Sequence, residues 1–162
     1  MESVAADAGE ARRRRRLTSS IKESVREMNV QLSLLNHQVS THLGLKDVDL
    51  ECYELIYRHG PLSPTALARQ AGLHPATMTG ILDRLERDGW VLRERDPADR
   101  RAVLVRALRD RNTELFKLLA TMNESMDELC AGYSEGELEL IYDFLLRTTT
   151  AGRDATDELS GG

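Results

Sequence analysis

Glycine and proline divide the middle of the chain into short segments. Gly44 stands before the first segment, the pair Gly60 and Pro61 ends it, and Gly89 ends the last. Glycine commonly terminates helices, and proline is tolerated in the first turn of a helix but not in its interior. The spacing therefore limits this region to short helices and excludes one long continuous helix.

Three helices are predicted between these breaks. The first spans Asp47–His59, the second opens at Ser63 and Pro64, and the third opens at Pro75 with His74 as its N-cap. Serine is a good N-cap, and proline suits the first helical position. Two short helices joined by a tight turn that contains glycine form a helix-turn-helix, whose second helix is the one that reads DNA in proteins of this design.

A β-hairpin is predicted after Gly89. Trp90–Arg95 and Arg101–Arg106 have the residues of strands, and the polar residues 96–100 between them form the turn. Strand-forming runs that flank a turn of Asp and Pro residues are typical of a hairpin. The hairpin would stand beside the helix-turn-helix as a wing with an arginine at its tip.

Long amphipathic helices are expected on both sides of this region. Apolar residues recur in steps of three and four from Leu17 to Val39. Asp110–Ala131 is expected to form another helix, and Ser134 with Glu137 matches a capping box at the start of the last one. These helices carry more apolar surface than a small domain covers, which favours a subunit interface over an ordinary core face. The residues expected at a dimer interface are Leu17, Ile21, Val25, Leu138, Ile141 and Leu145.

The predicted fold is mainly α with a small β-hairpin wing: a winged helix-turn-helix with long dimerisation helices at both ends. The expected parts are a disordered basic tail at 1–16, dimerisation helices at 17–45 and 109–150, a DNA-binding domain at 46–108 and a flexible tail at 151–162. No apolar run is long enough to span a membrane, and no apolar stretch follows Arg12–Arg16 as in a secretory signal. A cytoplasmic protein is expected.

Charge is distributed unevenly along the chain. The net charge is −5, which by itself argues against nucleic-acid binding. Residues 84–111, however, hold nine arginines against six acidic residues, and the last third of the chain is acidic. A chain can be acidic overall and still present one basic face.

Several motifs together resemble the MarR family of bacterial regulators. They are Leu67–Leu73, Ala76–Thr79, Leu82–Val91 and Asp96–Val103, and the resemblance runs from about Leu17 to Thr150. It implies a sequence-specific transcriptional regulator, a repressor, that binds an inverted-repeat operator in double-stranded DNA as a homodimer. Gly80 departs from the family pattern, in which a larger and often basic residue is common.

The DNA contacts are expected on the reading helix and the wing. On the helix they are Pro75, Ala76, Thr77, Thr79, Gly80 and Arg84; on the wing they are Arg95, Asp99, Arg100 and Arg101. Threonine can meet base edges or phosphates in the major groove, and an arginine can read the minor groove. The resemblance implies that Asp99 pairs with a wing arginine and directs it. The alternative is that these threonines are plain helix surface and that Asp99 and Arg101 only stabilise the hairpin.

Control by a ligand is left open by the residues. The resemblance implies a small aromatic effector between the dimer helices and the winged domain. Cys52 and Cys130 raise the alternative of thiol-based redox sensing, but neither has neighbouring cations, so two buried, inert thiols are favoured. No cofactor is expected, and four scattered histidines do not suit a metal site.

Two other classes of protein were weighed. The acidic charge and Gly80 suit a winged-helix module that binds proteins and has no operator. An enzyme is not expected, because the chain has no phosphate-binding glycine loop, no zinc-protease motif and no nucleophile paired with a base.

Overall fold

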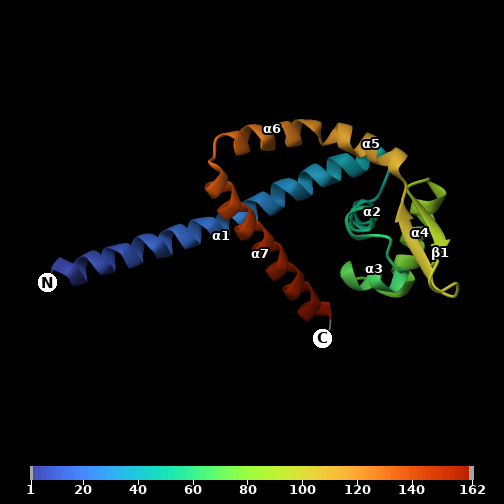
Figure 1. Cartoon of the computed structure of the whole chain (residues 1–162), viewed down its shortest axis with the longest axis horizontal. Helices are drawn as coiled ribbons and strands as arrows, with labels where there is room; N and C mark the ends of the chain where they lie inside the picture. The colour runs from blue at the N-terminus through green and yellow to red at the C-terminus, as the bar shows by residue number, and fades with distance from the viewer. Residues whose placement is uncertain (1, 161–162) are drawn as a thin grey trace.

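The computed structural model describes residues 2–160 and the side chains of residues 9–159. Its elements are α1 (Glu2–Leu43), α2 (Asp47–His59), α3 (Pro64–Gln70), α4 (Pro75–Arg87), β1 (Val91–Arg95), β2 (Val103–Ala107), α5 (Arg109–Leu118), α6 (Ala120–Ala131) and α7 (Glu135–Ser160). Figure 1 shows α2, α3, α4 and the hairpin gathered at the C-terminal end of α1, while the N-terminus lies at the far end of that helix. The predicted fold class, helical with one two-stranded hairpin, is confirmed.

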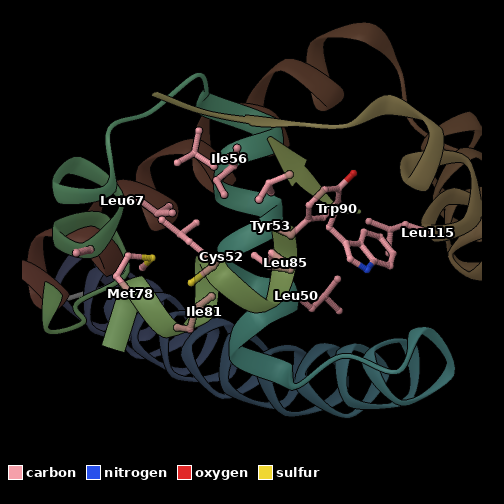
Figure 2. Close-up of a cluster of buried hydrophobic side chains, with 14 of the residues drawn as sticks. Leu50, Cys52, Tyr53, Ile56, Leu67, Met78, Ile81, Leu85, Trp90 and Leu115 are labelled. Carbon is pink, nitrogen blue, oxygen red and sulfur yellow. The ribbon is translucent and has the colours of Figure 1, made fainter. Parts of the chain in front are cut away.

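One apolar core joins the three short helices and the hairpin (Figure 2). Tyr53 on α2, Leu67 on α3 and Leu82 on α4 are completely buried, and Trp90 closes the core just before β1. The rings of Tyr53 and Trp90 meet edge to face, with centroids 5.1 Å apart. Burying a side chain of this size stabilises a fold by about 1.5–3 kcal/mol, so this core holds α4 in place.

The predicted helix starts are confirmed by their capping bonds. The Ala66 N–H donates to Ser63 Oγ at 3.2 Å, and the Ala76 N–H donates to His74 Nδ1 at 3.2 Å. Gly72 lies between the two helices with φ 63°, a left-handed conformation that suits glycine. Local chemistry therefore sets the turn of the helix-turn-helix.

The hairpin is antiparallel and is tied to the segment before α3. Arg93 pairs with Val105 across the two strands. Leu62 exchanges both backbone hydrogen bonds with Val105, at 3.1 and 2.8 Å. The wing stem is therefore anchored to the helical core while its tip projects from the molecule.

The two ends of the chain are helical where the sequence analysis expected tails. The residues expected to form a disordered tail, 1–16, belong to α1 from Glu2 onward, and the flexible tail expected at 151–162 belongs to α7 as far as Ser160. Residues 1, 161 and 162 lie outside the described part. Alanine, glutamate and arginine are strong helix formers, so a polar composition did not exclude a helix here.

The helix expected over Asp110–Ala131 is broken in two. The backbone leaves helical geometry at Leu119, between α5 and α6. Leu115 on α5 is buried in the core, whereas α6 has no buried residue. The break lets α5 pack on the winged domain while α6 runs away from it.

Large apolar side chains remain exposed on α1 and α7. Leu17 is 64% exposed, and Leu140 is 70% exposed. Farther along α1, Val39 is buried in the core, so only the last turns of the apolar stripe are covered within the chain. Figure 1 shows the two helices crossing, and a groove at the crossing is lined by Ile21, Val25 and Phe144 among others.

Candidate nucleic-acid interface

The exposed face of α4 begins at its N-terminus. Pro75, Ala76, Thr77 and Thr79 are all exposed. The opposite face is buried through Met78, Ile81, Leu82 and Leu85, which hold the helix in the core. The first turn of α4 therefore presents methyl groups and hydroxyls on an exposed surface, as the sequence predicted.

Thr79 is partly occupied by its own helix. Its hydroxyl donates a hydrogen bond to the Pro75 carbonyl at 3.1 Å. The oxygen keeps lone pairs that can accept from a base amino group. Thr77 has no such bond among the described residues and is the freer of the two.

Gly80 directly follows Thr79 on α4 and is half-buried. A methyl group added there would lie 3.7 Å from Arg84 Nη1, an ordinary van der Waals distance. Close packing therefore does not explain the glycine.

Arg84 is not positioned for the DNA contact that the sequence predicted for it. Its Nε and Nη2 donate to Asp49 Oδ2 and Oδ1 at 2.8 and 2.7 Å. Asp49 is 2% exposed, and its hydrogen bonds raise the pKa of Arg84 above the ordinary value. The guanidinium that was expected to face DNA is instead committed to α2, which argues against a direct DNA contact by this side chain.

The wing tip presents two free arginines. Arg100 and Arg101 are exposed, and within residues 9–159 neither guanidinium has a hydrogen-bond or ion-pair partner. The carboxylate of Asp99 accepts from the Arg101 backbone N–H at 3.0 Å, and Arg95 donates to the Arg100 carbonyl at 2.8 Å. Asp99 and Arg95 thus shape the loop through its backbone, and Asp99 makes no ion pair with a wing arginine in this structure.

A clamp between the wing and α4 was not predicted from the sequence. Arg93 on β1 donates to Glu86 Oε2 and Asp83 Oδ1, each at 2.6 Å. Asp83 and Glu86 are three residues apart on α4 and so share one face of the helix. The sequence pattern that could have indicated this clamp is two acidic residues three positions apart on a helix, followed by an arginine on the next strand. The clamp sets the direction of the wing relative to the reading helix.

The two cysteines differ in their surroundings. Cys52 is buried, and burial raises the pKa of its thiol to about 12. Cys130 is exposed on α6, so the expectation that both thiols are buried is wrong for Cys130. No group of three or more metal-ligating side chains is present among the described residues. Over the same part of the chain, no helix is long and apolar enough to cross a membrane.

Comparison with known proteins adds independent evidence. The family model described as "MarR family" matches residues 47–103. An uncharacterised HTH-type transcriptional regulator of Bacillus subtilis, YcgE, is 33% identical over 132 residues, which cover 82% of this chain and 86% of that protein.

Solved structures agree with the sequence relatives. The crystal structure of MarR matches with a TM-score of 0.53 and 25% identity, covering 82% of this chain and 96% of MarR. A mutant of Staphylococcus aureus MepR, solved bound to an oligodeoxyribonucleotide, has the same fold, with a TM-score of 0.53 and 19% identity over 78% of this chain and 93% of MepR. The winged helix-turn-helix and the extent of the match to YcgE lead to one conclusion: this chain belongs to the MarR family of DNA-binding transcriptional regulators.

Proposed function

We propose that this protein is a homodimeric repressor that binds an inverted-repeat operator in double-stranded DNA and is released from it by a small aromatic effector. The observation that carries the proposal is that the exposed first turn of α4 occurs together with Arg100 and Arg101 at the wing tip, whose guanidinium groups have no partner among the side chains of residues 9–159. A relative that is 31% identical over 84 residues, about half of each chain, is named as the transcriptional repressor YetL, which supports the direction of regulation. A regulator of this kind works in the cytoplasm, where its operator lies.

DNA recognition would be divided between a reading helix with few base-reading side chains and a wing with arginines at its tip. The first turn of α4 holds no Arg, Asn or Gln, the side chains that form bidentate bonds with guanine or adenine. Pro75, Ala76, Thr77 and Thr79 would contact base edges, thymine methyls and phosphates in the major groove. Arg100 would enter the adjacent minor groove, with Arg101 beside it, and there read groove width and negative potential.

The experiment compares variants that each lose one positive charge, at the wing tip or elsewhere. The parent protein first enriches duplexes from a random-sequence pool, and the enriched duplex then serves as the probe in mobility-shift titrations. Arg100→Ala should weaken binding by about 1–3 kcal/mol and reduce the salt slope by about one. Lys117→Ala removes the same charge from an exposed position on α5, outside the residues assigned to DNA contact, and should leave the affinity unchanged.

Two results would overturn parts of this proposal. If the parent enriches no sequence at low salt, the chain is better described as a winged-helix module that binds proteins. If Arg100→Ala binds as tightly as the parent, the wing does not carry the recognition assigned to it.

Dimerisation follows from the need to reach two half-sites. Two reading helices must lie about 34 Å apart to enter successive major grooves, which one copy of α4 cannot do. We assign residues 46–108 to DNA binding and residues 17–45 and 109–150 to the dimer. The supporting observation is the exposed apolar surface on α1 and α7, which is larger than isolated chains usually leave in water.

A cavity at the base of the wing suits an aromatic anion. It measures 960 Å³ and is lined by residues of α2, β2 and α5 that include Tyr57, Arg58, Arg106, Arg109 and Asn112. Arg58 and Arg109 would bind a carboxylate, whereas Arg106 is already paired with Glu94 at 3.5 Å, and the Tyr57 ring would pack on an aromatic group. Asn112 is 8% exposed, and its buried Oδ1 has no hydrogen-bond partner in the described part of the chain, an uncommon state that a bound donor would relieve.

The effector proposal is tested with a panel of aromatic carboxylates. A member that binds should raise the melting temperature and release the enriched duplex. Asn112→Leu should lose this response and keep DNA binding, because Asn112 lies outside the residues assigned to DNA contact. A panel with no effect on the parent, or an Asn112→Leu protein that responds fully, would reject this cavity as the effector site.

A further inference from the structure

The first turn of α2 carries two carboxylates, each of which contacts a different helix. Asp47 contacts α1, and Asp49 contacts α4. The helix of the proposed dimer interface and the reading helix are therefore both held by side chains two residues apart on α2.

The contact with α4 is a buried, two-point ion pair. Both oxygens of Asp49 accept from Arg84, at 2.8 and 2.7 Å, and the arginine side chain is 31% exposed. A bidentate guanidinium–carboxylate pair fixes orientation as well as distance, because its two hydrogen bonds are parallel. Apolar contacts press α4 onto the core, but they are far less directional than this pair.

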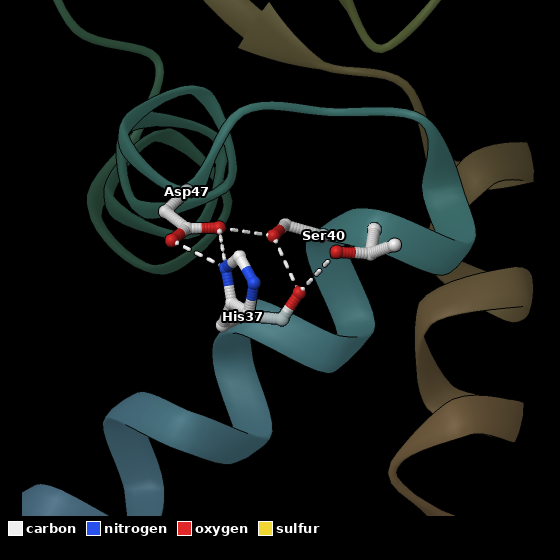
Figure 3. A network of polar contacts seen from close by, with 4 residues as sticks. His37, Ser40 and Asp47 are labelled. Carbon is white, nitrogen blue, oxygen red and sulfur yellow. Dashed lines mark hydrogen bonds and ion pairs between the residues drawn. The ribbon is translucent and has the colours of Figure 1, made fainter.

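The contact with α1 is a small polar network at the end of that helix (Figure 3). The Ser40 hydroxyl hydrogen-bonds to Asp47 Oδ1, and His37 Nδ1 lies 2.9 Å from Asp47 Oδ2. Ser40 is 1% exposed, and its hydrogen bond with Asp47 is the main reason that the pKa of this carboxyl is lowered. The ionised form of Asp47 is thus the one that holds α2 against α1.

We infer that Asp49, with Asp47 beside it, is a positioning residue for operator recognition: Asp49 orients the reading helix through Arg84, and Asp47 sets the winged domain against α1. This inference rests on the proposed function as a dimeric operator-binding protein. In a dimer, the placement of the winged domain on α1 determines the separation of the two reading helices, and the pose of α4 determines which base edges its first turn reaches. Neither aspartate touches DNA in this role.

The substitution Asp49→Asn distinguishes a positioning role of Asp49 from a purely electrostatic effect, because the two predict opposite changes in DNA affinity. It removes a negative charge near the DNA-binding face and frees Arg84, and simple electrostatics predicts that both changes strengthen DNA binding. A positioning role predicts the opposite for the duplex enriched by the parent, a loss of about tenfold, comparable to one mismatched base pair. Binding to a scrambled duplex of the same length should not weaken, since it depends on charge and the variant carries one negative charge fewer.

A matched control removes the same charge at the far end of the reading helix. Asp88→Asn, at the C-terminal end of α4, breaks an exposed pair with Arg87 and should not weaken binding to either duplex. Asp49→Asn binding to the enriched duplex that equals or exceeds that of the parent would overturn the inference. Failure of the parent to enrich any duplex would instead overturn the proposed function, so the two failures are distinguishable.

A second variant covers the case in which Asp49→Asn does not fold. Replacing a buried ion pair by apolar residues of similar volume is often neutral or stabilising, so Asp49→Leu with Arg84→Met should keep the fold by circular dichroism. The same loss on the enriched duplex is expected from this double variant, and parent-like affinity would contradict the positioning role.

A separate binding experiment tests the contact of Asp47 with α1. Asp47→Asn should weaken binding to the full inverted repeat by more than about threefold and leave a single half-site unchanged, because only the full site senses the spacing of the reading helices. Equal loss on both duplexes would assign Asp47 to the stability of the winged domain and remove it from the inference.

Discussion

At the scale of the residue, the arginines of the winged domain differ in the partners they find. Arg84 and Arg93 are held by carboxylates, whereas Arg100 and Arg101 are free of such partners among the side chains of residues 9–159. Only a cation that is not already neutralised releases counterions when it meets a phosphate. The number of arginines in this region therefore overstates its capacity to bind DNA.

Cys130 should account for all thiol reactivity of the folded protein. Burial raises the pKa of Cys52 to about 12, so at pH 8 this thiol stays protonated and unreactive, whereas Cys130 is exposed. A disulfide reagent should label a Cys130→Ser variant only after denaturation and a Cys52→Ser variant in the native state. Native labelling of Cys130→Ser would favour a redox-sensing role for Cys52.

At the scale of the element, the two sides of α4 differ in how strongly their residues stabilise the helix, and the buried side stabilises it more. Met78, Ile81 and Leu85 are buried, and His74 caps the first turn. The exposed side carries small residues and a glycine in mid-helix. Glycine in a helix interior is less favourable than alanine by about 1 kcal/mol, so the reading helix is intrinsically weak at its centre.

Gly80→Ala should stabilise the protein. The new methyl group would meet only Arg84 Nη1, at 3.7 Å, and the helix would gain about 0.5–1 kcal/mol in the free energy of unfolding measured in urea. Gly89→Ala is the contrasting control: its φ is +75°, a strained conformation for alanine, so this variant should be destabilised. Destabilisation by Gly80→Ala would show that the glycine serves a backbone conformation in α4.

At the scale of the whole molecule, the described part of the chain leaves many large apolar side chains of two long helices, α1 and α7, exposed. Ile21 and Leu145 are each 39% exposed, and Tyr142 is 68% exposed. The winged domain, by contrast, has a complete core. The molecule thus consists of a packed domain joined to helices that a second copy would cover.

Ile21→Asp should shift the protein from dimer to monomer. A charge placed in the apolar stripe of α1 would be buried without a partner in the dimer, which is strongly unfavourable. Sedimentation should detect the change, and affinity for a full inverted repeat should fall toward that for a half-site. Leu159→Asp, near the end of α7 at 87% exposure and outside the proposed interface, should remain dimeric. A dimeric Ile21→Asp protein would exclude this stripe from the interface.

Features that depend on residues close together in the chain were predictable from the sequence. Ser63 and His74 cap their helices, and Glu137 accepts from the Ser134 N–H at 2.8 Å, as the capping patterns predicted. The open face of α4 and the exposed wing tip also follow from local periodicity and turn chemistry. Hydrogen bonding and steric preference act over a few residues, so one sequence contains this information.

Features that depend on distant residues were decided by the tertiary structure. Asp49 and Arg84 are 35 positions apart, and nothing local to either residue indicates that they pair. The break at Leu119, the exposure of Cys130 and the clamp by Arg93 likewise depend on which surfaces meet when the winged domain packs. The sequence by itself determined the winged helix-turn-helix and its family, whereas only packing decided which of its arginines remain free to meet DNA.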